Sequence, residues 1–430
     1  MNTLKYRFLW TWDHSTNWSK KNIAIQEKGA FNPYLKSPDV FLEDYYLLLD
    51  FMESMDFNGL IIWGFFRDAH GGEKYAEKII KYAKNKKIKI LPGIGLGAYG
   101  GIYYEGNHPY NLKTYISKNP KLTAIDKNGN KLKNILCPSK EENIEWYLKG
   151  IDWLFDNFEI EGVNLETGDY GICWCSDCKK RRDEENNFSV GDIKVYLPVI
   201  EKIHQKSPYC LIIMALYIPP FTDGINIFFD LPSYIIPQWR LTEIIEEYPI
   251  NYVNRETYLK FKDKIFLLPQ KTQIGFFHQG SQWFLDTRHE CVIKSIYNAV
   301  KFVKDFTFSG LITHGEVSAY ESPEWFLNYL AFSYFTKNIN SSIEDFAGIL
   351  SKYVKDGREY ISLLFSGNKK EEIENAIKYL EKIKYFTKYP WESQEYQLWR
   401  WLLKELYRRY YLLSQWEKGG QNDTKIKKSR

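Results

Sequence analysis

An alternation of two patterns constrains the fold of this chain more than any other feature of its sequence. Over the first 320 residues, short apolar runs of strand length alternate with longer amphipathic segments of helical period. Several runs are almost entirely apolar, which is typical of parallel strands that are buried on both faces. The eight runs are Tyr6–Trp12, Gly59–Phe65, Ile88–Ile94, Gly162–Glu166, Leu211–Ile218, Ile235–Trp239, Thr272–His278 and Gly310–His314.

The segments between these runs decide between two α/β topologies. Those with helical period include Val40–Met55, Glu73–Lys86, Glu141–Asn157, Val190–Gln205, Arg288–Lys304 and a stretch from Asp192 to Lys206 that continues through Pro198. Eight strands alternating with helices over roughly 300 residues predict a (β/α)₈ TIM barrel. A doubly wound open sheet is the competing topology, but no strand is followed by G-x-G-x-x-G or a P-loop. The glycine-rich segment Gly93–Gly101 lacks the Lys-Ser/Thr ending of a P-loop, so we interpret it as a flexible loop.

Beyond the last strand the pattern is almost wholly helical. The candidate helices are Glu324–Phe335, Ile343–Phe365, Lys370–Phe386 and Ser393–Gln415. We therefore predict a catalytic barrel over residues 1–322, a helical C-terminal extension packed on it over 323–418, and a disordered tail over 419–430.

Charge and hydropathy narrow the classes of partner. The formal net charge is only +4, with no basic stripe, so nucleic acid is not the favoured partner. The longest nearly apolar stretch, Gly59–Phe66, is far too short to cross a membrane, and we predict no membrane partner. The first residues lack the apolar core and cleavage site of a signal peptide, which predicts a cytoplasmic location. The sequence leaves assembly into a homo-oligomer open.

Carboxylates and imidazoles follow three of the predicted strands. In a barrel these strand ends meet on one face, where active sites occur. The residues concerned are Asp13, His14, Glu166, Asp169, His314 and Glu316. A single acidic residue after a strand is usually a helix cap or a solvated charge. That explanation is weaker for Glu166 and Glu316, because each comes after an apolar strand and before a segment with the Gly, Ser or Thr residues of a turn.

Paired carboxylates are the groups that glycosidic bond cleavage needs. One stays protonated to protonate the leaving oxygen, and the other is ionised to attack the anomeric carbon or activate water. We predict Glu166 as general acid/base and Glu316 as nucleophile or base. Asp169 and Asp13 would hold sugar hydroxyls or tune Glu166.

Aromatic residues make up 17% of the chain, and several lie near the predicted strand ends beside polar side chains. Planar apolar walls with hydroxyl-reading groups are typical of a carbohydrate pocket, although aromatic residues also fill cores. The predicted substrate-binding residues are Trp12, Asp13, His14, Trp63, Arg67, Tyr170, Gln238, Trp239, Arg240, His278, Trp283 and His314.

Three of the six cysteines form a C-x-C-x-x-C motif, Cys173, Cys175 and Cys178, after the fourth strand. In a cytoplasmic protein this spacing indicates thiolate metal binding more than disulfides. Cys137 is a candidate fourth ligand, and four thiolates suit a structural zinc. The alternative is a set of reduced thiols that only pack. We predict that catalysis itself requires no cofactor.

These motifs resemble those of known TIM-barrel glycoside hydrolases. LETGDYGICWCSDC, ILCPS and GEVSAYESPEWFLNYLAFSYFTKNINSSIEDF are similar to segments of families related to β-N-acetylhexosaminidases and α-glucuronidases. The resemblance implies exo-acting glycoside hydrolysis with Glu166 as general acid. Hexosaminidases have an adjacent Asp-Glu pair at this strand end, whereas here the pair is Glu166 and Asp169. The large retaining clan has Asn directly before its acid/base, whereas here Leu165 separates Asn164 from Glu166.

The sequence thus predicts an exo-acting, retaining glycoside hydrolase for short oligosaccharides or glycosides. If a substrate acetamido group were the nucleophile, Glu316 would become a binding residue. Two alternatives stay open at this point. One is a carbohydrate-binding barrel without catalysis, and the other is a metal-dependent hydrolase that uses the cysteine cluster.

Overall fold

The computed structural model describes most of the first 350 residues and parts of the remainder. The described residues are 2–21, 34, 36–167, 172–185, 192–215, 225–241, 255–277, 292–320, 323–350, 370–382, 399–400, 402–404, 406–407, 410–411 and 414. The chain divides into two compact units. One comprises residues 1, 3–288 and 299–318, and the other comprises 2, 289–298 and 319–430.

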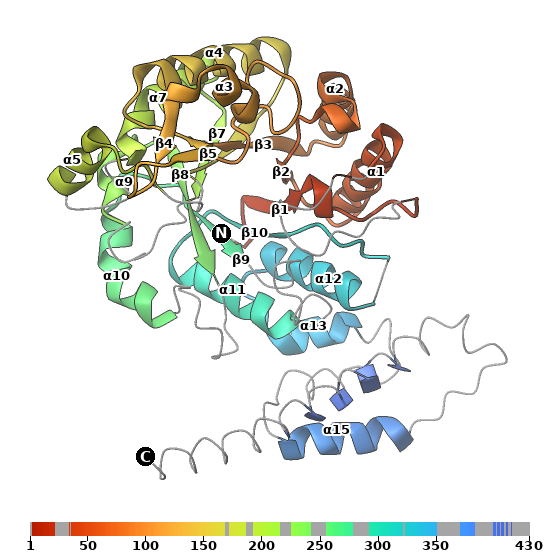
Figure 1. Cartoon of the computed structure of the whole chain (residues 1–430). Helices are drawn as coiled ribbons and strands as arrows, with labels where there is room; N and C mark the ends of the chain where they lie inside the picture. Colours follow the sequence, from red (N-terminus) through yellow and green to blue (C-terminus); the bar gives the residue numbers. More distant parts are fainter. Residues whose placement is uncertain are drawn as a thin grey trace, which may run out of the picture. The chain divides into compact units, whose positions relative to one another are not determined.

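Eight parallel strands close into a barrel in the first unit, in the order β1-β10-β9-β8-β7-β6-β3-β2 (Figure 1). Their bounds are β1 Tyr6–Trp12, β2 Gly59–Trp63, β3 Lys89–Gly95, β6 Gly162–Glu166, β7 Leu211–Ala215, β8 Ile235–Leu241, β9 Ile274–Phe277 and β10 Gly310–His314. Each coincides with one predicted apolar run, within a few residues at the ends. The predicted (β/α)₈ barrel is therefore confirmed.

Helices alternate with the strands along the chain. They are α1 Pro38–Ser54, α2 Gly72–Asn85, α4 Glu141–Asn157, α5 Ser176–Glu185, α7 Leu197–Lys206, α9 Ile227–Asp230, α10 Arg255–Leu267 and α11 Ile293–Asp305. The helix predicted through Pro198 is shorter than expected. A 3-10 turn covers Lys194–Tyr196, and α7 starts at Leu197 with Pro198 in its first turn. Proline is tolerated there because the first helical N–H groups have no partner within the helix.

Aromatic side chains of β1 fill much of the barrel interior. Tyr6, Phe8, Trp10 and Trp12 alternate along the strand, so all four point inward and belong to one buried cluster. The other members of that cluster are Ile61, Trp63, Leu91, Ile213, Ile236, Ile274, Phe276 and Ile312. This interior is a packed core, and chemistry is confined to the ends of the strands.

A long insertion follows β3 and contains elements that the sequence analysis did not predict. They are helix α3 Leu112–Lys118 and a small antiparallel pair, β4 Thr123–Ile125 and β5 Lys131–Leu136. Both strands are short and β5 is mostly exposed, so neither leaves an apolar run in the sequence.

The glycine-rich segment that opens this insertion is held in place by its backbone. The N–H of Leu96 donates to the carbonyl of Glu166 at 2.7 Å, and the N–H of Gly97 donates to the Tyr147 hydroxyl at 2.7 Å. These donors are thus unavailable to a phosphate. The segment is an ordered turn and not the flexible loop that we predicted.

The second unit is helical over its described residues, with α12 Pro323–Lys337, α13 Ile343–Leu350 and α15 Lys370–Lys382. In this unit Phe346 of α13 packs against Phe335 of α12, with ring centroids 5.0 Å apart. The part of the predicted extension beyond α13 that lies at 351–369 and 383–398 falls outside the described residues.

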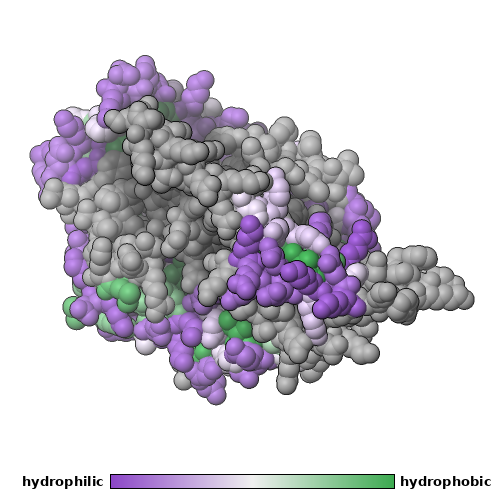
Figure 2. Space-filling model, turned by 90° about the horizontal axis from the view of Figure 1, so that it is seen from below, coloured by the Kyte–Doolittle hydropathy of each residue, from purple (hydrophilic) through white to green (hydrophobic). Residues whose placement is uncertain are grey.

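The face of the molecule in Figure 2 is mostly hydrophilic where its residues are coloured. The face in Figure 2 shows hydrophobic residues only in small separate patches among hydrophilic ones. Within the described ranges, no helix is both long enough and apolar enough to span a membrane.

Candidate functional site

Glu166 is the last residue of β6 and has the same strand parity as Asn164. Both side chains therefore point into the barrel, and Glu166 is buried at its carboxyl end. Its register partners on the two neighbouring strands are Gly95 and Ala215. Both partners are small, so neither places a bulky side chain beside the carboxylate.

A layer of hydrogen-bonded side chains surrounds Asn164, two residues before Glu166 on β6. The indole N–H of Trp63 donates to Asn164 Oδ1 at 2.9 Å, and Asn164 Nδ2 donates to Gln238 Oε1 at 2.9 Å. The ring of Trp63 fits because the residue beside it on β3 is Gly93. A Cβ atom at position 93 would lie 2.3 Å from that ring. We predicted from the sequence that Trp63 and Gln238 bind substrate. In the structure their hydrogen bonds to Asn164 connect β2, β6 and β8. The shared parity of Asn164 and Glu166 was the signal that could have found this layer.

Replacing Asn164 by Leu is expected to destabilise the barrel. The substitution leaves the Trp63 N–H and the Gln238 oxygen buried without this partner, at about 1–3 kcal/mol for each group. Urea unfolding of the variant measures the loss, with Asn157→Leu at the exposed end of α4 as control. Equal midpoints for the two variants would show that the layer contributes nothing.

Glu316 follows β10 and is held against β1. Its Oε1 accepts the backbone N–H of Trp12 at 3.0 Å and the hydroxyl of Ser15 at 2.9 Å. The side chain is buried, and both donors stabilise its ionised form. Sequence reasoning missed Ser15, which lies in the short turn Asp13–Ser15 directly after β1.

An aromatic cluster surrounds Trp12 at the same end of the barrel. The ring centroids of Trp63, His14, Tyr104 and Tyr99 lie 5.3, 5.4, 5.5 and 6.1 Å from that of Trp12. Trp12 and His14 are buried, whereas Tyr99 and Tyr104 are partly exposed. The two tyrosines come from the insertion after β3 and were not predicted. A partly open aromatic surface of this kind can stack on the apolar face of a sugar.

His314 ends β10 and points into the barrel between Trp10 and Phe276, at ring distances of 5.3 and 5.0 Å. Burial, together with the nearby charge of Arg240 on β8, lowers the pKa of His314 to about 3. The imidazole is therefore neutral at ordinary pH. Arg240 is thus close enough to His314 for its charge to act on the imidazole.

The buried neutral state of His314 has a consequence for acid stability. In the unfolded chain the imidazole of His314 binds a proton below its ordinary pKa of 6.5, whereas in the folded protein it stays neutral. The free energy of unfolding therefore falls as the pH decreases from 6.5 towards 3. Between pH 7 and pH 5 this loss is roughly 2 kcal/mol. We expect His314→Asn to lose that much less stability over this interval in urea unfolding. His204→Asn on α7 is the control, and identical pH dependence in wild type and His314→Asn would contradict the expectation.

Asp13 is fully buried beside β2 in a cluster of charges. Its carboxylate lies 3.0 Å from His70 Nδ1, 3.6 Å from Lys36 Nζ and 3.8 Å from Arg67 Nε. Burial alone would raise the pKa of Asp13, but Lys36, His70 and Arg67 together hold it well below its usual range. Arg67 also pairs with Glu105. These contacts favour a structural role for Asp13 over the hydroxyl-holding role predicted from sequence.

Other predicted residues lie elsewhere or outside the described part of the chain. Trp239 has the opposite parity to Gln238 and points away from the barrel interior. Its indole N–H donates to Gln273 Oε1 at 2.8 Å, and its ring packs against Phe228 of α9. Trp239 therefore packs in the outer core, and its contact with substrate stays a prediction from the sequence. Asp169, Tyr170, His278 and Trp283 lie outside the described residues.

The four predicted metal ligands come together. The sulfur atoms of Cys137, Cys173, Cys175 and Cys178 all lie within 4.8 Å of one another. Three of the four side chains are buried, and Cys175 is partly exposed. Hydrogen bonds from Cys137 and Cys178 lower the pKa of Cys173.

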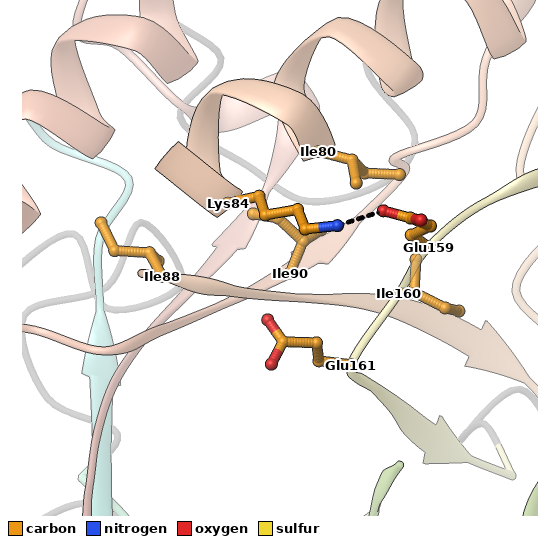
Figure 3. A pocket seen from close by; sticks show the side chains of 7 residues that line it. All are labelled: Ile80, Lys84, Ile88, Ile90, Glu159, Ile160 and Glu161. Carbon is orange, nitrogen blue, oxygen red and sulfur yellow. Dashed lines mark hydrogen bonds and ion pairs between the residues drawn. The ribbon is translucent and has the colours of Figure 1, made fainter. Parts of the chain in front are cut away.

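A shallow hollow lies at the opposite end of the barrel strands, where β3 and β6 begin (Figure 3). Its lining includes the carboxylates of Glu159 and Glu161. Glu159 pairs with Lys84 and Glu161 pairs with Lys89. These acids are neutralised on the surface and have no aromatic neighbours in the lining, so this hollow lacks the features of a sugar site.

Comparison with known proteins gives matches in structure only. No protein-family model matches the chain, and no curated protein matches it. A crystal structure of β-N-acetylhexosaminidase from Bacteroides fragilis has a TM-score of 0.52 at 13% identity, covering 81% of this chain and 69% of that one. Flavobacterium johnsoniae chitobiase has a TM-score of 0.50 at 12% identity, covering 89% of this chain and 55% of its own length. At these identities the likeness shows that the chain shares the (β/α)₈ barrel fold of these proteins.

Proposed function

We propose that this protein is a glycoside hydrolase that uses Glu166 as general acid and Glu316 as the ionised carboxylate. The observation that carries the proposal is the environment of these two residues. Both lie at the carboxyl end of the barrel, where Glu166 faces small neighbours and Glu316 accepts two hydrogen bonds. A glycosidase requires one carboxyl group that keeps its proton and one that is ionised.

The roles follow from the chemistry of the glycosidic bond. Glu166 would protonate the leaving oxygen, since it is buried and burial disfavours the charged form of a carboxyl group. Glu316 would support the positive charge that develops at the anomeric carbon, either as nucleophile or through water. A retaining, exo-acting reaction on short oligosaccharides or glycosides is the form that we propose.

The surroundings of the pair suit a sugar ring. Trp12, Tyr99 and Tyr104 supply a partly open aromatic surface, and the neutral His314 and the charged Arg240 supply hydrogen-bonding groups. Since two proteins of similar fold are named as a β-N-acetylhexosaminidase and a chitobiase, N-acetylhexosaminides are the first substrates to test.

A hydrolysis screen tests the proposal. The purified protein is incubated with aryl α- and β-glycosides, N-acetylhexosaminides and uronides, and aryl alcohol release is measured. Turnover of at least one class is the expected result, and the anomer released, followed by NMR, separates retention from inversion. Sugar binding by calorimetry without any turnover would support the carbohydrate-binding barrel in place of the enzyme.

A further inference from the structure

Four cysteine sulfurs form a compact group in the barrel unit. The Sγ atom of Cys137 lies 3.5 Å from that of Cys173 and 3.7 Å from those of Cys175 and Cys178. A tetrahedral zinc with Zn–S bonds of about 2.3 Å holds its sulfurs about 3.8 Å apart. These three sulfur–sulfur distances are thus close to the edge length of the tetrahedron that a bound zinc would impose.

We propose that these four cysteines bind one structural Zn²⁺ that ties the insertion after β3 to the segment after β6. Cys137 comes directly after β5, and the other three come from the C-x-C-x-x-C motif at the start of α5. The two ligand-bearing segments are far apart in sequence, so the ion would cross-link the chain as a disulfide does in an oxidising compartment.

The polar groups around the sulfurs fit a negatively charged centre. Four thiolates and one Zn²⁺ carry a net charge of −2. Arg181 Nη2 lies 3.4 Å from Cys178 Sγ, and the Ser139 hydroxyl lies 2.9 Å from the same sulfur. Arg182 Nη2 donates to the carbonyl of Cys173 at 2.7 Å. Such outer contacts orient metal ligands and compensate their charge.

The backbone on both sides of the site is already in place. The N–H of Cys137 donates to Leu122 at 3.0 Å, and its carbonyl accepts Asn143 Nδ2 at 2.9 Å. On the other side, the N–H of Trp174 donates to the carbonyl of Ile125 in β4 at 2.8 Å. A preorganised scaffold lowers the cost of gathering four ligands, as in other closed zinc sites.

The geometry indicates a closed site with no catalytic position. A catalytic zinc keeps one position for water or substrate, whereas here four thiolates complete a tetrahedron. The metal-dependent hydrolase considered from the sequence is therefore disfavoured. A cluster of several irons would hold its ligating sulfurs farther apart than 4.8 Å. Since Cys173 lies only seven residues beyond Glu166, the ion would fix the segment that leaves the end of β6.

Metal analysis of the whole protein tests the proposal without reference to activity. Protein purified under reducing conditions is expected to contain one zinc per chain by mass spectrometry of the metals. Cys175→Ser changes the partly exposed ligand and should lose most of the zinc. Cys210→Ser, at the start of β7 and outside the group, should keep it.

A second measurement covers the case in which ligand variants fail to fold. Wild-type protein stripped by a chelator is titrated with Co²⁺, and intense visible bands of tetrahedral thiolate-bound Co²⁺ are expected, which Zn²⁺ then removes. Absence of these bands together with absence of zinc would overturn the site. Iron at one per chain, or full zinc retained in Cys175→Ser, would equally overturn the assignment. A silent glycoside screen would leave these results unchanged, so the two proposals fail independently.

Discussion

Replacing Glu166 by Gln is expected to lower kcat/KM for glycoside hydrolysis by at least about 10²-fold. Glutamine keeps the shape of the side chain but has no proton to give to the leaving oxygen. Because Glu166 has small register neighbours, Gly95 and Ala215, the substitution should fit without rearrangement. The variant should therefore retain wild-type unfolding behaviour while losing activity.

The leaving group provides a sharper form of this test. An aryl glycoside with a very acidic phenol needs little protonation, so Glu166→Gln should be impaired much less on it than on a disaccharide. Glu161→Gln is the matched control, since Glu161 lies next to the other end of β6 beside the hollow of Figure 3. A uniform loss across leaving groups, or no loss, would remove Glu166 from the role of general acid.

The second large effect is expected at Asp13. Asp13→Asn keeps the side-chain volume but removes a buried charge that faces Lys36, His70 and Arg67. Breaking a buried ion pair costs about 3–5 kcal/mol, and we expect the lower end because Lys36 keeps Asp44 and Arg67 keeps Glu105. Urea unfolding followed by tryptophan fluorescence measures the loss.

The pH dependence of this loss identifies its cause. The folded state lowers the pKa of Asp13, so the stabilisation is complete above the ordinary value of 3.8 and disappears as the pH falls through the lower folded value. The gap between wild type and Asp13→Asn should therefore be constant near neutral pH and shrink in acid. Asp56→Asn removes an exposed partner of Arg7 and should cost less than about 1 kcal/mol. A comparable cost for both variants would mean that the buried cluster has no special stability.

Much of the barrel could be predicted because its signals are local. A parallel strand that is buried on both faces is mostly apolar, and each of the eight barrel strands coincides with a short, mainly apolar run of the sequence. The short pair β4 and β5 was missed because it is stabilised by its surroundings and has no such run. The helix expected through Pro198 begins only at Leu197. The cause is local, because proline is tolerated in the first turn of a helix and not in its interior.

The candidate site was predictable only in part. Position at a strand end placed Glu166 at the carboxyl end of the barrel, but it does not say which face of the strand a side chain is on. Trp239 was assigned to the mouth on the same ground, although it packs outward against Phe228. Tyr99 and Tyr104 were missed because they reach Trp12 from an insertion whose path has no sequence signature.

The sequence by itself determined the alternation of strands and helices and the positions of Asp13, Glu166 and Glu316 at or just after the ends of barrel strands. Apolar periodicity and the parallel closure of strands suffice for these features. Only the tertiary structure decided which groups surround each carboxylate. Asp13 and Glu316 both follow strands, yet Lys36 and Arg67 surround the first, whereas Trp12 and Ser15 donate to the second. The proximity of Cys137 to Cys173 was decided in the same way. Protonation and metal binding depend on distances of a few ångströms between segments remote in sequence, and folding alone sets those distances.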